Sequence, residues 1–290
     1  MEIRAVYLHD ASAAWLNDLC RMSADLARFS NELVSGIDFD TLEPGWRAWD
    51  DQNGTGALRD PLRNSLKVQK FAVLAGNGLL FSAAHSATNS LVEGGFHPYT
   101  PLATGVLCRS AVEQLLYSHY LLSSIGHEEL AARVFKIYSK GIRDYRWSGR
   151  NRSGRASLID IFAQWAEGRN IPKKPVYDPA GLLNAIVEFD DAPYSYLSDF
   201  VHGNPLTTAL SVVDAQEDLG FNRQYDFWSL AIAFVVSLSV SKIFAGKYPH
   251  VVSGAQLKQL GKFEKFSGTL SLRAVESWGP PKEIPDRDFD

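Results

Sequence analysis

Two charged residues stand out in an otherwise uncharged stretch of the sequence. Between residues 94 and 127, only Arg109 and Glu113 carry a formal charge. On a helix this i, i+4 spacing places both side chains on the same face. A charge is tolerated in an apolar environment only when it is paired and hydrogen-bonded, so we predict a buried Arg109–Glu113 ion pair. The pair can be a structural polar network, or Arg109 can await an anionic ligand while Glu113 holds it in place.

A second group of polar residues lies near residue 200. Asp199 precedes His202 by three residues and Ser198 precedes it by four, so all three can share a helical face. His202 falls in the last turn of the predicted helix, where the helix dipole favours an imidazolium. Asp199 could orient the ring for proton transfer. The alternative is a histidine that only caps and packs.

The third signal is electrostatic. Residues 133–174 contain eleven Lys and Arg against three acidic residues, in a chain whose net charge is −4. On the predicted helix at 127–147 the cations step by three and four residues, which makes a basic stripe suited to a phosphate backbone. The alternative is a solvated face balanced by an acidic neighbour. The stripe consists of Arg133, Lys136, Lys140, Arg143 and Arg146.

The two polar motifs together resemble a known family. Arg-x-x-x-Glu followed about ninety residues later by Tyr-Leu-Ser-x-x-x-His-Gly is similar to a group of bacterial all-helical proteins known only as a domain of unknown function. That group is related more loosely to the HEPN superfamily. The resemblance covers roughly residues 100–205 and falls on Arg109, Glu113, Tyr196, Ser198 and His202.

The resemblance carries expectations about function. HEPN relatives imply an antiparallel bundle, frequent dimerisation and, in some members, metal-independent RNA cleavage in toxin or phage-defence systems. Active HEPN ribonucleases place Arg and His on one helix at short spacing, and no predicted helix here has that arrangement. Cleavage would therefore require Arg109 and His202 to meet in space.

The leading hypothesis is a HEPN-like protein that binds RNA or a nucleotide, with possible ribonuclease activity. Arg109 would hold a phosphate, Glu113 would fix the guanidinium, and His202, oriented by Asp199, would be the general acid or base. The basic helix at 133–150 would hold the polyanion. The residues expected to contact the substrate are Tyr117, Tyr196, Ser198, Asn204, Lys136, Lys140 and Arg143.

Two other classes of function stay open. A non-catalytic interaction module would use the Arg–Glu–His set as a structural network and the basic stripe to dock an acidic partner. A small-molecule enzyme, such as a cyclase, would use a cavity beside the small-residue helix at 62–92. A deep pocket lined by Asn77, His85 and Asn89 would favour this last reading.

No metal or cofactor is expected. The sequence lacks the paired Glu-x-x-His motifs of di-iron bundles, a Gly-rich phosphate loop and a nucleophile elbow. Cys20 and Cys108 are too few for a disulfide framework or a four-cysteine zinc site.

The elements that must position these residues are helices. Apolar residues recur at spacings of three and four through most of the chain. We predict an all-α antiparallel bundle of about eight to ten helices, with the helix at 101–125 central and the one at 227–244 beside it. Helices are expected at 11–37, 62–92, 101–125, 127–147, 157–167, 180–189, 193–202, 227–244 and 256–266. Weak alternation in Glu2–Leu8 and Thr269–Val275 would allow a minor terminal β-ribbon.

The 290 residues, 46% hydrophobic and 21% charged, describe a folded globular chain. We expect one helical domain over 1–278, with a mobile loop at 38–61 and a disordered tail at 279–290. The small residues of the helix at 62–92 predict close helix packing, and its Gly76-Asn77-Gly78 could kink it. A cytoplasmic bacterial location, no membrane span and a possible homodimer complete the expectations.

Overall fold

The computed structural model describes residues 2–38, 61–92, 100–144, 176–188, 193–202 and 221–270, with isolated positions between these ranges. Eight α-helices and one short 3-10 helix make up its regular structure, and the described residues form no strand. The predicted all-α class and number of helices are confirmed.

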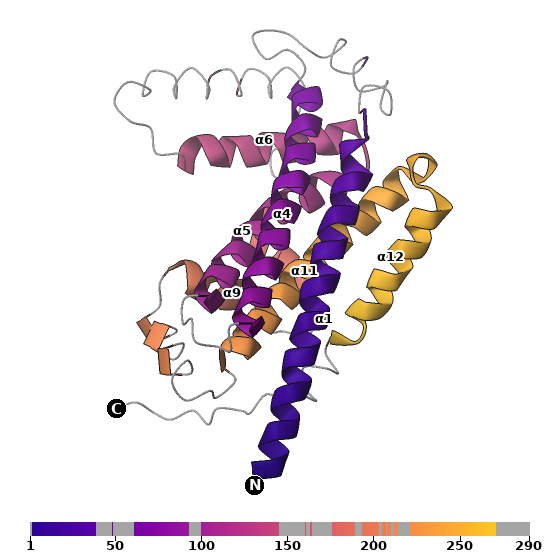
Figure 1. Ribbon diagram of the computed structural model, residues 1–290. Helices are drawn as coiled ribbons and strands as arrows, with labels where there is room; N and C mark the ends of the chain where they lie inside the picture. Colours follow the sequence, from indigo (N-terminus) through magenta and orange to yellow (C-terminus); the bar gives the residue numbers. More distant parts are fainter. Residues whose placement is uncertain are drawn as a thin grey trace.

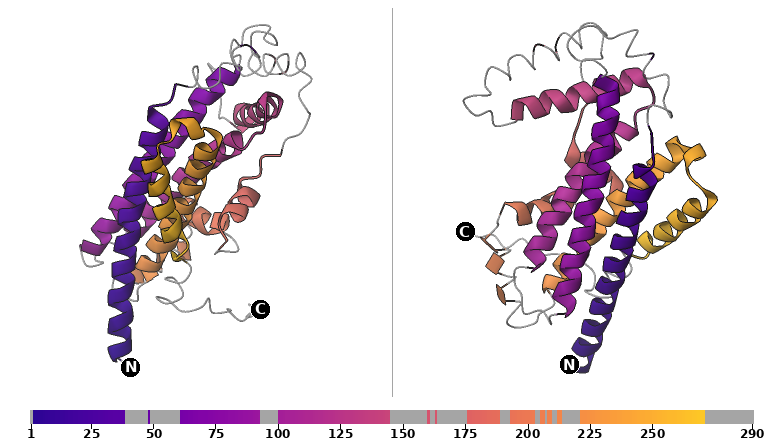
Figure 2. Two further views of the ribbon diagram at one scale, coloured as in Figure 1. Left: turned by 90° about the vertical axis from the view of Figure 1, so that its right-hand side faces the viewer. Right: turned by 45° about the horizontal axis from the view of Figure 1, so that its top comes forward.

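Four long helices form the body of the molecule (Figure 1). Four shorter ones pack around them, with α6 lying across one end of α4 and α5 and α12 flanking α11 (Figure 2). The long helices are α1 (Glu2–Ser35), α4 (Pro61–Val92), α5 (Thr100–Leu122) and α11 (Phe221–Lys247). The shorter ones are α6 (His127–Asp144), α8 (Pro179–Ile186), α9 (Pro193–Val201) and α12 (Gly254–Ser267), and a 3-10 turn (Pro249–Val251) precedes α12.

The contacts between side chains define the direction of each long helix. Ser30 of α1 meets Asn77 of α4, and Lys70 meets the end of α1, so these two helices are antiparallel. α5 in turn is antiparallel to α4. His119 and the end of α5 lie beside Ser239 and Lys247, so α11 runs parallel to α5. About one hundred residues separate α5 from α11, and a connection of that length permits this parallel arrangement.

α5 is the central helix of the bundle, as predicted for residues 101–125. α5 contacts α4, α11, α6, α8 and α9, and its buried residues lie on several of its faces. α11 packs directly against it, as predicted. A helix that is apolar on all sides must be enclosed by other elements, which explains why α5 and α11 lie inside the bundle.

α11 also has the length and composition of a membrane span. Its residues Asn222–Lys247 pass that test, and 72% of the most apolar window is buried within the structure. Buried core helices of soluble proteins pass the same test, so this helix is weak evidence for a membrane span.

A buried polar network joins three of the long helices. The Asn77 amide donates to Ser30 Oγ at 3.0 Å and its carbonyl oxygen accepts from Ser237 Oγ at 2.6 Å. Ser30 Oγ lies 2.9 Å from Ser241 Oγ. Because each partner is buried, sliding one helix past another would leave polar groups unsatisfied in the core. The network therefore fixes the register of α1, α4 and α11.

Close approach of α4 and α5 explains the small residues of α4. A Cβ placed on Gly76 would lie 2.7 Å from Leu115 Cγ and 3.1 Å from the Ala111 carbonyl oxygen. Nothing lies within 4 Å of the same position on Gly78. The predicted tight packing is thus present at Gly76.

The predicted amino-terminal strand is wrong. Glu2–Leu8 belongs to α1, which extends further toward the amino terminus than the predicted start near residue 11. Extending an existing helix adds one hydrogen bond per residue, whereas a strand needs a partner for its backbone groups.

Several other predicted features fall outside the described residues. They are the loop at 38–61 apart from its end positions and residue 48, the basic loop at 148–155, the helix at 157–167 apart from two positions, and the tail at 279–290. The carboxy-terminal partner strand at 269–275 is described only at its first two residues, which are not extended.

The two glycines of α4 give a matched test of this packing. Gly76→Ala should lower the free energy of unfolding by about 1–3 kcal/mol, because the new methyl group must displace Leu115. Gly78→Ala should raise it by up to about 1 kcal/mol through helix propensity. Urea unfolding followed by circular dichroism measures both changes. Equal effects of the two substitutions would contradict the close approach.

Candidate functional site

The predicted Arg109–Glu113 ion pair is present, but only the arginine is buried. Arg109 Nη2 lies 2.8 Å from Glu113 Oε1, and the two side chains are 8% and 48% exposed. Glu113 therefore balances the guanidinium from the solvent side of α5.

The aromatic ring of Tyr194 covers the same guanidinium. Arg109 Cζ lies 3.8 Å from the centre of this ring, which is a close cation–π contact. Arg109 Nη1 is buried and has no hydrogen-bond partner. An incoming phosphate would meet Glu113 and Tyr194 before it reached the cation. This geometry favours the structural role of the pair over anion capture.

A cluster of tyrosines continues along α5 from Arg109. Tyr117 stacks on Tyr177 with ring centres 5.2 Å apart, and Tyr120 packs against the same ring at 5.0 Å. Burial, followed by the neighbouring Tyr117, Tyr194 and Glu113, raises the pKa of the Tyr177 hydroxyl above its ordinary value. We call Tyr117, Tyr120 and Tyr177 the tyrosine cluster, of which Tyr117 is the most exposed member.

Three of the predicted stripe residues lie on the solvent side of α6. Lys140 and Arg143 are exposed and Lys136 is partly exposed. Lys140 Nζ lies 5.9 Å from the centre of the Tyr177 ring, so this cation adjoins the tyrosine cluster. No acidic residue occurs between Glu129 and Asp144 in the sequence. Arg146 is outside the described residues.

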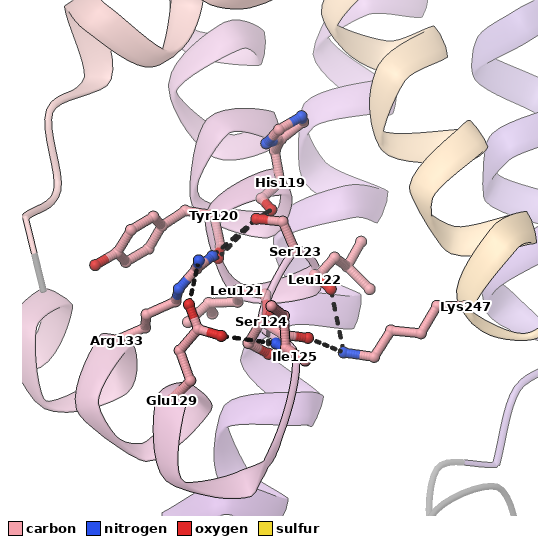
Figure 3. A network of polar contacts seen from close by, with 10 residues as sticks. All are labelled: His119, Tyr120, Leu121, Leu122, Ser123, Ser124, Ile125, Glu129, Arg133 and Lys247. Carbon is pink, nitrogen blue, oxygen red and sulfur yellow. Dashed lines mark hydrogen bonds and ion pairs between the residues drawn. The ribbon is translucent and has the colours of Figure 1, made fainter. Parts of the chain in front are cut away.

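Arg133, the first residue of the predicted stripe, instead turns inward and holds the end of α5 (Figure 3). Its guanidinium donates to the Tyr120 carbonyl oxygen and to Ser123 Oγ, and it pairs with Glu129 Oε1 at 2.6 Å. Glu129 also accepts a hydrogen bond from the Ile125 amide at 2.8 Å, which lowers the pKa of its carboxyl. Arg133 is therefore a structural residue.

Lys247 completes this cap from α11 (Figure 3). Its ammonium donates to the carbonyl oxygens of Leu122 at 3.1 Å and Ser124 at 3.3 Å. The last carbonyls of a helix lack intrahelical partners and carry partial negative charge, so both cations stabilise this end of α5.

His119 is the residue beside this cap whose pKa is most altered. Its Nε2 lies 3.2 Å from Ser239 Oγ, and its buried Nδ1 has no hydrogen-bond partner. Burial, and secondarily the charge of Arg133, lowers its pKa from 6.5 to about 4. The charge of Arg133 near His119 could not be predicted from the apolar pattern of α5.

The predicted residues of α9 are dispersed. The Tyr196 ring stacks on Tyr225 with centres 5.5 Å apart. Ser198 Oγ donates to the Tyr194 carbonyl oxygen at 2.7 Å, within its own helix. His202 is an exposed turn residue just after α9. The Asp199 side chain and Asn204 lie outside the described residues.

The structure does not bring Arg109 and His202 together by any hydrogen bond or ion pair within its described part. Arg109 contacts Tyr194 near the start of α9, and His202 follows Tyr194 by eight residues. Eight residues correspond to about 12 Å along a helix axis. A shared catalytic centre for these two residues stays a prediction.

Neither cysteine is placed for thiol chemistry. Both cysteines are buried, and desolvation raises the pKa of Cys20 to about 12 and that of Cys108 well above its ordinary value. Neither thiol is thus a ready nucleophile. Those ranges contain no group of three or more His, Cys, Asp or Glu residues able to hold a metal ion.

The chain was compared with protein-family models, with curated proteins and with solved structures, and none of the three comparisons finds a match. The resemblance to HEPN proteins therefore stays a prediction.

The inward and outward cations of α6 should differ in their effect on stability. Arg133→Ala should lower the free energy of unfolding by about 2 kcal/mol, because it leaves carbonyls of α5 and the Glu129 carboxylate without their partner. Arg143→Ala should change it by less than about 0.5 kcal/mol, because that side chain is exposed. Denaturant unfolding at neutral pH distinguishes the two. A similar loss in both variants would show that Arg133 does not support α5.

His119 should make stability depend on pH. Its folded pKa of about 4 lies below the ordinary 6.5, so the unfolded chain binds more protons between these values. The contribution of His119 to the free energy of unfolding is complete above pH 6.5. It declines as the pH falls toward 4, by at most about 2 kcal/mol between pH 7 and pH 5. His119→Gln should reduce this slope. Unfolding curves at several pH values test the effect, and an identical slope in both proteins would contradict it.

Proposed function

We propose that the protein binds single-stranded RNA through the solvent side of α6. The observation that carries the proposal is the position of Lys136, Lys140 and Arg143, which line one side of this helix without an intervening acidic residue. Such a row can follow successive phosphates, and binding is strengthened by release of the counterions condensed on the nucleic acid.

The tyrosine cluster adds a surface for a base. Tyr117 is 36% exposed and stacks on the ring of Tyr177. Lys140 Nζ lies 5.9 Å from the centre of that second ring. Exposed aromatic rings beside cations are the usual way in which proteins bind single strands without reading their sequence. Stacking on Tyr117 would hold a base while α6 holds the backbone on either side.

The proposal is confined to binding. Arg109 is covered by Tyr194 and paired with Glu113. These contacts suit a structural role, in which Arg109 positions Tyr194 beside the tyrosine cluster, better than a catalytic role at a scissile phosphate. No hydrogen bond or ion pair joins His202 to Arg109 among the described residues, where Arg109 meets Glu113 and Tyr194. Cleavage by Arg109 and His202 would need a rearrangement of α9.

Charge substitution on α6 tests the proposal. The triple variant Lys136→Gln, Lys140→Gln, Arg143→Gln should bind a labelled oligouridine at least about tenfold more weakly at low salt. Its salt dependence should fall by about two units of log Kd per log salt, as expected for three lost phosphate contacts to a single strand. Fluorescence anisotropy at several salt concentrations measures both quantities.

α12 supplies a matched control. Lys258→Gln, Lys262→Gln, Lys265→Gln removes the same charge from exposed positions on another helix and should leave RNA affinity within about twofold. Equal weakening by both triple variants would show that net charge, not α6, governs binding. Failure of the unaltered protein to bind RNA would overturn the proposal and favour an acidic protein as the partner of α6.

A further inference from the structure

A partly enclosed pocket of about 210 Å³ lies between α4, α5 and α6. Its walls are mainly apolar, with Val68 and Ala72 from α4, Tyr117 from α5 and Tyr138 from α6. None of the residues that line it carries a charge. It differs from the cavity considered from the sequence, because Asn77 is buried in the helix network and His85 and Asn89 are exposed.

One polar side chain in this wall lacks a partner. Gln69 is 4% exposed, and its amide nitrogen is buried without a hydrogen bond. Its main-chain carbonyl oxygen accepts a hydrogen bond from Ser118 Oγ at 3.1 Å, so the backbone at this point is anchored. Buried amide donors are nearly always satisfied in folded proteins, and an acceptor that entered this pocket would satisfy the one on Gln69.

The size and lining of the pocket suit an organic molecule better than water. Its volume corresponds to about seven water molecules, each of which would need two to four polar partners that these walls do not supply. An apolar cavity of about 150 Å³ holds a benzene ring, so this pocket has room for a ring with a short substituent. A charged group would be disfavoured here, because nothing in the lining could balance it.

We propose that the pocket binds a neutral, planar six-membered ring that carries a carbonyl oxygen, with that oxygen accepting a hydrogen bond from the Gln69 amide. The rings of Tyr117 and Tyr138 provide aromatic surface for it. The pocket shares Tyr117 with the proposed RNA surface, but none of the cations of that surface lines it. Val134 of α6 lines the pocket, whereas Lys136, two residues on, projects from roughly the opposite side of the helix.

Two probe compounds distinguish the parts of this proposal. Benzamide has the ring and the carbonyl, and toluene has a ring of similar size without an acceptor. Saturation-transfer NMR titrations with the full chain should show saturable binding of benzamide at millimolar or lower concentration. Gln69→Met keeps the side-chain volume and removes the amide, so it should weaken benzamide about tenfold and leave toluene unchanged.

A filled pocket provides the complementary test. Ala72→Leu places a larger side chain in the pocket and should abolish binding of both compounds, whereas Ala75→Leu on the exposed side of α4 should not. Absence of benzamide binding, its survival in Ala72→Leu, or equal loss of both compounds in Gln69→Met would overturn the proposal. Gln69→Met decides the outcome even if Ala72→Leu fails to fold.

Discussion

Cations from neighbouring helices hold the carboxy-terminal ends of two core helices. Lys70 of α4 donates to the carbonyl oxygens of Ser35 and Ile37 at the end of α1. Arg133 and Lys247 do the same for α5. The last carbonyls of a helix have no partner within that helix, and at these two ends donors from another element satisfy them. These contacts make the position of one helix depend on where its neighbour stops.

Much of the fold could be predicted from the sequence because the helical period is strong and the central helix has almost no charge. The Arg109–Glu113 pair follows from the same facts, since two charges in an apolar helix must meet if they lie one turn apart. Small residues in α4 predicted close packing, and Gly76 supplies it. These inferences depend on neighbours within one helix, which the sequence displays directly.

The features that could not be predicted from the sequence depend on how different helices cross. Arg133 and Lys140 belong to the same predicted stripe, yet one turns inward because α6 begins next to the end of α5, and the other faces solvent. Tyr194 lies eighty-five residues from Arg109 and still covers its guanidinium. Nothing in the sequence around Gln69 indicated a binding site, because its unmatched amide is seen only once three helices enclose a pocket. Spacing within a helix contains no information on such encounters.

The parallel entry of α11 has a consequence for synthesis of the chain on the ribosome. α1, α4 and α5 emerge first, and the groove that α11 will occupy, with Ser30 and Asn77 at its floor, stays uncovered meanwhile. About one hundred further residues must be added before α11 begins, which takes roughly 5–20 s at ordinary translation rates. For that interval the nascent chain exposes the apolar surface that α11 later covers, and this surface is open to aggregation until α11 has been made.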